Sequence, residues 1–288
     1  MQLPTKSSEM SDIHRSFYVL LAACGIAAIS GTSARAADES PWSNDVRSAV
    51  RLIAGTSGKS DATLRGGIEI KMQSGWKTYW RYPGDSGVPP RFDFSGSENL
   101  KTAKVLYPAP HLFVDETGHS LGYKDSAIFP LVITPQQSGK PVRLHMKIDY
   151  AVCEKLCVPA EGSAELSLAP GDSSHNAALT AAEARVPKQV PAAQLALTAR
   201  RVNVAAKPLV AVDLAVPAGQ AVELFVEGPT PEWALPIPTP AQGAPAGHAH
   251  FGFELDGLPP GVDPKGSFEL TFTVITGERA VEVKTRLD

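Results

Sequence analysis

Apolar and polar residues alternate in short segments along the chain, and Gly, Pro, Asn and Asp separate these segments. The alternation is clearest in VRLHMKIDYAV (142–152), where an apolar or aromatic residue stands at every second position. Side chains two residues apart point to the same face of a β-strand. The segment therefore predicts a strand with one buried face, formed by Val142, Leu144, Met146, Ile148 and Tyr150.

Further short segments of this kind predict strands before residue 170. They cover residues 48–55, 66–72, 76–82, 103–109, 127–135 and 163–169. Seven or so short strands with turns between them are typical of an immunoglobulin-like β-sandwich. FVDETGHSLGYKD (113–125) is polar and contains glycine, and we expect it to be a connection between strands.

The composition changes after residue 170, where Ala, Pro and small polar residues predominate. NAALTAAEAR (176–185) predicts a short helix, which Pro187 ends. Strands resume at 195–206, 209–217, 221–228, 250–258, 267–277 and 280–287, and we expect the proline-dense residues 228–250 to be an irregular surface excursion. The predicted fold is all-β. Two immunoglobulin-like β-sandwich domains in series, residues 37–170 and 195–288, are joined by a linker with a short helix (171–194).

The first 36 residues have the features of a secretory signal peptide. Arg15 precedes an apolar run (17–29), and SARA ends in an Ala-x-Ala cleavage pattern. We therefore expect cleavage after Ala36 and export to the periplasm. LAAC (21–24) also fits the cleavage pattern of bacterial lipoproteins, and this alternative would leave Cys24 lipidated as a membrane anchor.

The charge balance and the motifs exclude several classes of function. The chain has 27 Lys and Arg against 30 Asp and Glu, so a basic surface for nucleic acid is not expected. No Ser-His-Asp order, glycine-rich phosphate loop or paired-carboxylate pattern stands out. We infer no cofactor and no small-molecule substrate.

Cys153 and Cys157 stand with three residues between them in DYAVCEKLCVPAEG (149–162). In a turn between strands, residues i and i+4 can come within disulfide distance, and an oxidising compartment lets the bond form. As a structural staple this bond would be inefficient, because a ring of about five residues stabilises a fold by only ~2 kcal/mol through chain entropy. A reversible, redox-active disulfide is the second interpretation.

A metal site is the third interpretation of the pair. The Cys-x3-Cys-x-Pro pattern resembles that of the copper-binding Sco proteins, and thiolates favour Cu(I). In those proteins the pair opens a helix, whereas the residues after Cys157 predict a turn and a strand. A tetrahedral zinc site would require two more Cys or His ligands, and no histidine stands beside the pair.

DYAVCEKLCVPAEG and GWKTYWRYPGDSGVPPRFDF (75–94) together resemble the periplasmic N-terminal domain of the DsbD family of thiol-disulfide reductases, in particular its ScsB-like branch. The resemblance extends over residues 42–170 and implies an immunoglobulin-like fold in which Cys153 and Cys157 are the catalytic pair. The spacing departs from that of better-known members, where more residues separate the cysteines. Complete members also have a membrane domain and a thioredoxin-like domain, for which this chain has no room.

The resemblance also implies neighbours for the pair. Aromatic residues of the strand predicted at 76–82 lie beside the cysteines in the family, so we expect Tyr79 to lie near them. A loop that caps the disulfide in the family matches this chain at Asp115 and Glu116. A carboxylate beside the thiols would raise their pKa.

These patterns predict a periplasmic thiol-disulfide exchange protein, an oxidoreductase that depends on partner proteins. It would pass electrons to or from thioredoxin-like partners through Cys153 and Cys157, and a separate membrane protein would be the electron donor. The alternative is a non-catalytic copper-binding or protein-binding module with a structural disulfide. We expect the second domain to act as a spacer or a docking surface.

Overall fold

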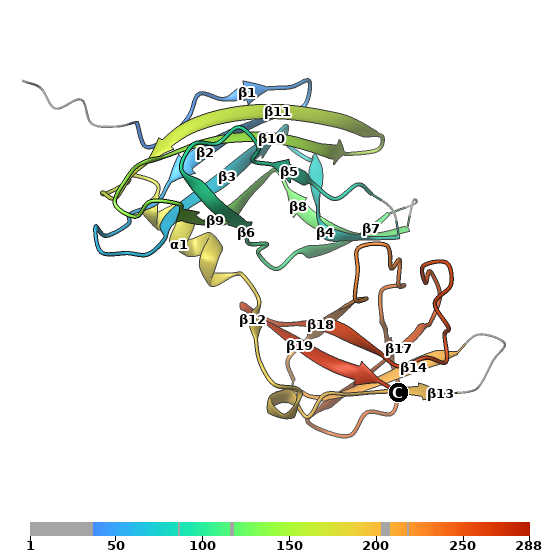
Figure 1. Ribbon diagram of the computed structural model, residues 1–288. Helices are drawn as coiled ribbons and strands as arrows, with labels where there is room; N and C mark the ends of the chain where they lie inside the picture. Colours follow the sequence, from blue (N-terminus) through green and yellow to red (C-terminus); the bar gives the residue numbers. More distant parts are fainter. Residues whose placement is uncertain (1–36, 86, 116–117, 203–207, 218) are drawn as a thin grey trace, which may run out of the picture. The chain divides into compact units, whose positions relative to one another are not determined.

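Strand β10 (Val142–Cys153) shows how alternation in the sequence becomes a buried face. In the computed structural model, its five alternating residues Val142, Leu144, Met146, Ile148 and Tyr150 are at most 3% exposed. The strand and the buried face predicted for this segment are therefore confirmed. The structure describes residues 37–288 except 86, 116–117, 203–207 and 218 (Figure 1).

Two antiparallel sheets form the first sandwich, residues 43–168, which we call the N-terminal sandwich. One sheet, with the order β1-β2-β3-β9-β6, contains β1 (Ser43–Asn44), β2 (Ser48–Ala54), β3 (Leu64–Met72), β6 (Leu100–Val105) and β9 (Ser126–Pro135). The other has the order β11-β10-β4-β8-β7, with β5 paired to β10. Besides β10 it contains β4 (Lys77–Gly84), β5 (Arg91–Asp93), β7 (His111–Asp115), β8 (Gly118–Lys124) and β11 (Cys157–Leu168).

One hydrophobic core fills the N-terminal sandwich. Ile68 of β3, Phe129 of β9 and Trp80 of β4 are fully buried in it. Because β3 and β9 belong to one sheet and β4 and β10 to the other, the core joins the two sheets face to face. This arrangement is the immunoglobulin-like sandwich that the strand pattern predicts.

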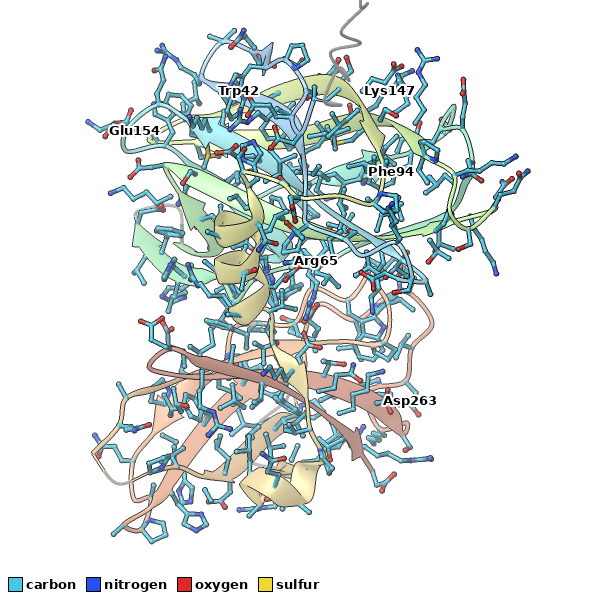
Figure 2. All side chains as sticks on the ribbon, turned by 90° about the vertical axis from the view of Figure 1, so that its left-hand side faces the viewer. Trp42, Arg65, Phe94, Lys147, Glu154 and Asp263 are labelled. Carbon is cyan, nitrogen blue, oxygen red and sulfur yellow. A yellow bond between two sulfur atoms is a disulfide. The ribbon has the colours of Figure 1, made fainter. Side chains whose placement is uncertain are left out.

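Helix α1 (Asn176–Ala184) confirms the predicted helical segment and packs on β9 and β3. Leu179 of the helix is fully buried, and a Cβ atom on Gly67 would stand 2.6 Å from its Cδ2 atom. Glycine on β3 therefore makes room for the helix. Arg65, which lies beside the helix in Figure 2, donates hydrogen bonds of 3.0 and 2.7 Å to the two carboxylate oxygens of Glu183.

Two further sheets form the second sandwich, residues 188–287, which we call the C-terminal sandwich. The sheet with the order β12-β19-β18-β15 contains β12 (Lys188–Gln189), β15 (Val222–Glu227), β18 (Phe268–Thr276) and β19 (Arg279–Leu287). The sheet with the order β13-β14-β17-β16 contains β13 (Thr198–Val202), β14 (Leu209–Ala215), β16 (Thr239–Ala241) and β17 (His248–Glu254). A 3-10 helix, η1 (Ala192–Leu195), precedes β13. The predicted fold class, two sandwiches in series with a short helical linker, is confirmed.

Two segments predicted as irregular contain regular or buried structure. Residues 113–115 lie in β7 and residues 118–124 in β8, so the prediction of a connection was wrong for these residues. The proline-dense residues 228–250 do not all lie on the surface, because Trp233, Leu235 and Ile237 are buried. The prolines do not prevent this packing, and Pro240 lies in β16, the strand at the edge of its sheet.

Buried contacts join the two sandwiches. Phe225 of β15 and Ile237 belong to the core of the N-terminal sandwich. The ring of Phe225 lies against that of Trp80, with 6.3 Å between the centroids. Residues Ala36–Asp288 accordingly form one compact unit.

The predicted signal peptide (1–36), with Cys24 and the cleavage site after Ala36, lies outside the described residues, as does Glu116. Within the described residues, no helix is long and apolar enough to cross a membrane.

Candidate functional site

Cys153 and Cys157 are joined by a disulfide at the tip of the β10–β11 hairpin. The strands pair without interruption from Val142 opposite Leu168 to Cys153 opposite Cys157. This register brings the two cysteine Cα atoms to 4.2 Å, and residues 154–156 form the turn between them. The ladder of the hairpin therefore places the two sulfur atoms together.

The two cysteines differ in exposure. Cys153, which ends β10, is 2% exposed, whereas Cys157, which begins β11, is exposed. Leu156, beside Cys157 in the turn, is 74% exposed. A protein that approaches the tip of the hairpin thus meets Cys157 and an apolar side chain before it meets Cys153.

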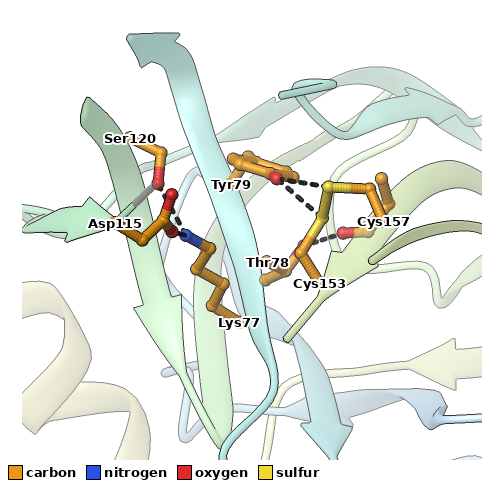
Figure 3. Close-up of a disulfide and its surroundings, with 8 residues drawn as sticks. Lys77, Thr78, Tyr79, Asp115, Ser120, Cys153 and Cys157 are labelled. Carbon is orange, nitrogen blue, oxygen red and sulfur yellow. Dashed lines mark hydrogen bonds and ion pairs between the residues drawn. A yellow bond between two sulfur atoms is a disulfide. The ribbon is translucent and has the colours of Figure 1, made fainter. Parts of the chain in front are cut away.

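Tyr79 covers the buried side of the disulfide (Figure 3). Its hydroxyl oxygen lies 2.7 Å from Cys153 Sγ and 3.1 Å from Cys157 Sγ. Strand β4 carries Tyr79 to this position because it pairs with the end of β10, where Lys77 is opposite Cys153. Thr78 strengthens this pairing through a hydrogen bond of 2.9 Å from its hydroxyl to the carbonyl oxygen of Ala151.

The Tyr79 hydroxyl is a hydrogen-bond donor at neutral pH. Burial raises the pKa of the phenol, and the negative charge of Asp115 raises it further, so the proton stays on the oxygen. A phenol that keeps its proton can donate to one sulfur atom at a time. The shorter distance favours Cys153 as the acceptor.

Lys77 lies on the other side of Tyr79 and is held by two groups. Its Nζ atom donates to Asp115 Oδ2 at 2.7 Å and to Ser120 Oγ at 2.9 Å. Lys77 comes from β4, Asp115 from the end of β7 and Ser120 from β8, so this group connects three neighbouring strands (Figure 3). The structure thus places Asp115 in an ion pair with Lys77.

A turn after β4 packs against the ring of Tyr79. Gly87 in this turn has a φ of +133°, and a Cβ atom built on it would lie 2.3 Å from Tyr79 Cε1. The backbone therefore approaches the ring as closely as glycine permits. The sequence YPGDSGVPP (82–90) indicates a turn by its glycines and prolines, but nothing in it shows which side chain the turn contacts.

Sequence reasoning also missed Lys77 and Ser120. Lys77 could have been found, because it stands two residues before Tyr79 and therefore shares a strand face with it. Ser120 could not, because its position depends on the pairing of β8 with β4. As for metal ligands, no group of three or more His, Cys, Asp or Glu side chains in the described part of the chain is arranged to hold an ion.

The chain was compared with known families, curated proteins and solved structures. Residues 48–169 match the family model for the N-terminal domain of the thiol:disulfide interchange protein DsbD. This segment is similar to the DsbD N-terminal family. The match includes the disulfide, Tyr79 and Asp115, and it confirms the resemblance seen in the sequence.

The chain also has a structural relative of nearly the same extent as its described residues. The crystal structure of the N-terminal periplasmic domain of ScsB from Proteus mirabilis superposes with a TM-score of 0.69 at 20% sequence identity. The superposition covers 87% of this chain and 98% of that one, so the likeness in fold includes the C-terminal sandwich. Cadherin-like domains 1 to 4 of zebrafish RET match with a TM-score of only 0.21, at 8% identity and over 87% and 65% of the two chains. No curated protein sequence matches the chain.

Proposed function

We propose that this protein is a periplasmic thiol-disulfide exchange protein that transfers electrons between partner proteins through Cys153 and Cys157. Residues 48–169 are similar to a family whose name describes thiol:disulfide interchange. The observation that carries the proposal is the construction of the disulfide, with one exposed and one buried cysteine and a phenol hydroxyl against both sulfur atoms. The periplasmic location rests on the ScsB domain, which is described as periplasmic, and on the signal sequence expected at residues 1–36.

The unequal exposure of the two cysteines supports an order for the exchange. A thiolate of the partner attacks Cys157 Sγ, because this is the sulfur that it can reach. A bond forms between the partner's sulfur and Cys157, the Cys153–Cys157 bond breaks, and its electron pair leaves on Cys153 Sγ. The Tyr79 hydroxyl, 2.7 Å away, donates a hydrogen bond to the thiolate that forms.

The second half of the exchange resolves the mixed disulfide. A second thiolate of the partner attacks the partner sulfur bound to Cys157, so the partner becomes oxidised and the Cys157 thiolate is released and takes up a proton. In the opposite direction, the Cys157 thiolate attacks a partner disulfide and Cys153 resolves the intermediate. In both directions the mixed disulfide joins the partner to Cys157, and Cys153 exchanges only with Cys157.

The surroundings of the pair support contact with a protein partner. Val88, Val114 and Leu156 are exposed at 51%, 68% and 74%. Leu156 lies in the turn that joins the cysteines, Val88 follows the Gly87 that contacts Tyr79, and Val114 precedes Asp115. Exposed apolar side chains near a reactive group mark a surface for protein contact. We assign Asp115 the role of holding Lys77 beside Tyr79, and Glu116 remains a proposed neighbour.

A structural role for the disulfide is the weaker explanation. The bond closes a ring of only about five residues, so its effect through chain entropy is ~2 kcal/mol. The N-terminal sandwich already has a core that spans both sheets, and the hairpin ladder holds Cys153 and Cys157 together without the bond. A staple would also not require one sulfur to be exposed.

Single cysteine variants test the proposal. Cys153→Ser removes the resolving thiol and leaves Cys157 exposed, so the Cys157 thiolate should attack the disulfide of an oxidised partner in a periplasmic extract and accumulate as a mixed disulfide, with the partner's other sulfur as the leaving thiolate. Cys157→Ser is the matched control, because the remaining Cys153 is buried and should form little adduct. Non-reducing and reducing gels, followed by identification of the adduct, measure the difference.

Other results from the same variants would support a structural disulfide, a copper-binding pair or the reverse order of attack. A structural disulfide predicts no adduct from either variant and a loss of ~2 kcal/mol in the free energy of unfolding. A copper-binding pair predicts that both variants lose Cu(I) in competition with a chelator, again without an adduct. Adduct formation by Cys157→Ser alone would reverse the assigned order of attack.

A further inference from the structure

Strand β4 separates from β8 immediately after Tyr79. Tyr79 pairs with Gly122 and the next pair is Gly84 with Ser120, so five steps along β4 correspond to two along β8. The residues between, Trp80 to Pro83, have no partners in β8, and we call this segment the bulge. A bulge redirects side chains and interrupts the ladder that would otherwise hold the strand, and bulges are over-represented next to active sites.

The C-terminal sandwich contacts three successive residues of this bulge. Trp80 packs against Phe225. Arg81 donates hydrogen bonds of 2.9 and 2.7 Å to the two carboxylate oxygens of Glu227 and a further one to Glu282. The hydroxyl of Tyr82 donates to the carbonyl oxygen of Leu235.

From these contacts we propose that the C-terminal sandwich positions Tyr79 against the disulfide, with Arg81 as the positioning residue. The proposal rests on the exchange chemistry assigned above to Cys153 and Cys157. It replaces the expectation that this sandwich is only a spacer or a docking surface.

Arg81 suits this role because of its place on the strand. It stands two residues after Tyr79, within the segment that has left β8, so its contacts with the C-terminal sandwich help to fix where that segment lies. The guanidinium is clamped between two carboxylates, and the three side chains are only 27%, 18% and 11% exposed for Arg81, Glu227 and Glu282. A bidentate arginine–carboxylate pair fixes orientation as well as distance.

Loss of Arg81 would release the bulge. Glu227 and Glu282 would then be close together without a cation, and their repulsion would push β15 and β19 away from β4. Tyr79 is the last residue of β4 before the bulge that is still paired, so movement of the bulge shifts its ring first. The hydroxyl would then lose its contact with Cys153 Sγ, and the thiolate formed on reduction would lose a donor.

The test measures the equilibrium between the Cys153–Cys157 disulfide and glutathione in the full chain. Tyr79→Phe removes the donor and should shift the equilibrium about fivefold toward the disulfide, the effect of one hydrogen bond. Arg81→Ala should shift it in the same direction by a comparable factor. Arg65→Ala is the matched control, because it also removes a bidentate arginine–glutamate pair but lies on β3 in the other sheet.

The double variant Tyr79→Phe with Arg81→Ala provides the decisive comparison. If Arg81 acts through Tyr79, the double variant should show no larger shift than Tyr79→Phe alone, whereas independent effects would add. If Arg81→Ala does not fold, Glu227→Gln, which keeps Arg81 and Glu282, should give a smaller shift of the same sign. An additive double variant, or an equilibrium no different from that of Arg65→Ala, would overturn the proposal.

This readout separates the inference from the proposed function. Glutathione replaces the protein partner, so the equilibrium reports the chemistry of the pair whether or not a physiological partner has been trapped. If no adduct is trapped but Arg81→Ala shifts the glutathione equilibrium as predicted, only the exchange role is rejected. If Cys153→Ser traps an adduct but Arg81→Ala leaves the glutathione equilibrium unchanged, only the positioning role is rejected.

Discussion

Substitution of Gly87 would disturb the disulfide site without changing Cys153, Cys157 or Tyr79. An added Cβ atom would lie 2.3 Å from Cε1, 2.5 Å from Cδ1 and 2.7 Å from Cζ of Tyr79. Carbon atoms pack at about 3.5–4.0 Å, so Gly87→Ala forces either the turn or the ring to move by roughly 1 Å. Either movement separates the hydroxyl of Tyr79 from Cys153 Sγ.

The magnitude follows from two contributions. A non-glycine residue at the positive φ of Gly87 costs ~1–3 kcal/mol, and overpacking against the ring adds ~1–3 kcal/mol. Gly139→Ala is the matched control, because Gly139 has a φ of +76° and a Cβ atom there would meet nothing within 4 Å. The difference between the two variants in the free energy of unfolding therefore combines the contact with Tyr79 and the greater backbone strain of an alanine at a φ of +133° than at +76°.

The same variants should differ in the chemistry of the disulfide. Cys157 is already exposed, so displacement of Tyr79 does not improve access to the attacked sulfur. It removes the donor to the leaving Cys153 thiolate, which is worth about 1 kcal/mol, so reduction of Gly87→Ala by dithiothreitol should be about fivefold slower. Urea unfolding and the kinetics of reduction measure the two effects. Equal values for Gly87→Ala and Gly139→Ala would refute the reasoning.

Two further predictions concern parts of the structure away from the disulfide. Leu179→Ala should lower the free energy of unfolding by ~2–4 kcal/mol in urea titrations, because the fully buried side chain fills the space above Gly67, while the rate of disulfide reduction should not change. Asp38 accepts hydrogen bonds from the backbone and the hydroxyl of Ser174, which lower its pKa from 3.8 to about 2. A depressed pKa stabilises the fold above the unfolded value, so this contribution should disappear as the pH falls from about 4 to 2, and Asp38→Asn should show a weaker loss of stability over that range.

The alternation of residues predicted the strands that have one buried and one exposed face. β10 is the clearest case, because each polar position between its core residues faces outward. β8 escaped prediction for the opposite reason. Its residues from Ser120 to Tyr123 are buried on both faces, so no alternation marks them, and Gly and Ser are not typical of strands. A pattern of period two cannot report a strand that is covered on both sides.

The candidate site was predictable only as far as local spacing determines it. The separation of Cys153 and Cys157 and the strand face of Tyr79 follow from the sequence. The ion pair of Lys77 with Asp115 and the packing of Gly87 on the Tyr79 ring depend on which strands become neighbours. The contacts of Arg81 with Glu227 and Glu282 join residues more than a hundred positions apart, and no local signal indicates them.

The chemistry of the Tyr79 hydroxyl shows which redox state the site is built to stabilise. Tyr79 is 2% exposed, and burial of a hydroxyl group costs free energy unless it is hydrogen-bonded. A disulfide sulfur is a weak acceptor, so in the oxidised protein the two contacts with sulfur compensate little of this cost. A thiolate at Cys153 is a charged acceptor and compensates more of it. A phenylalanine would serve a permanent disulfide better, so the tyrosine supports the proposed exchange, in which a thiolate forms on Cys153.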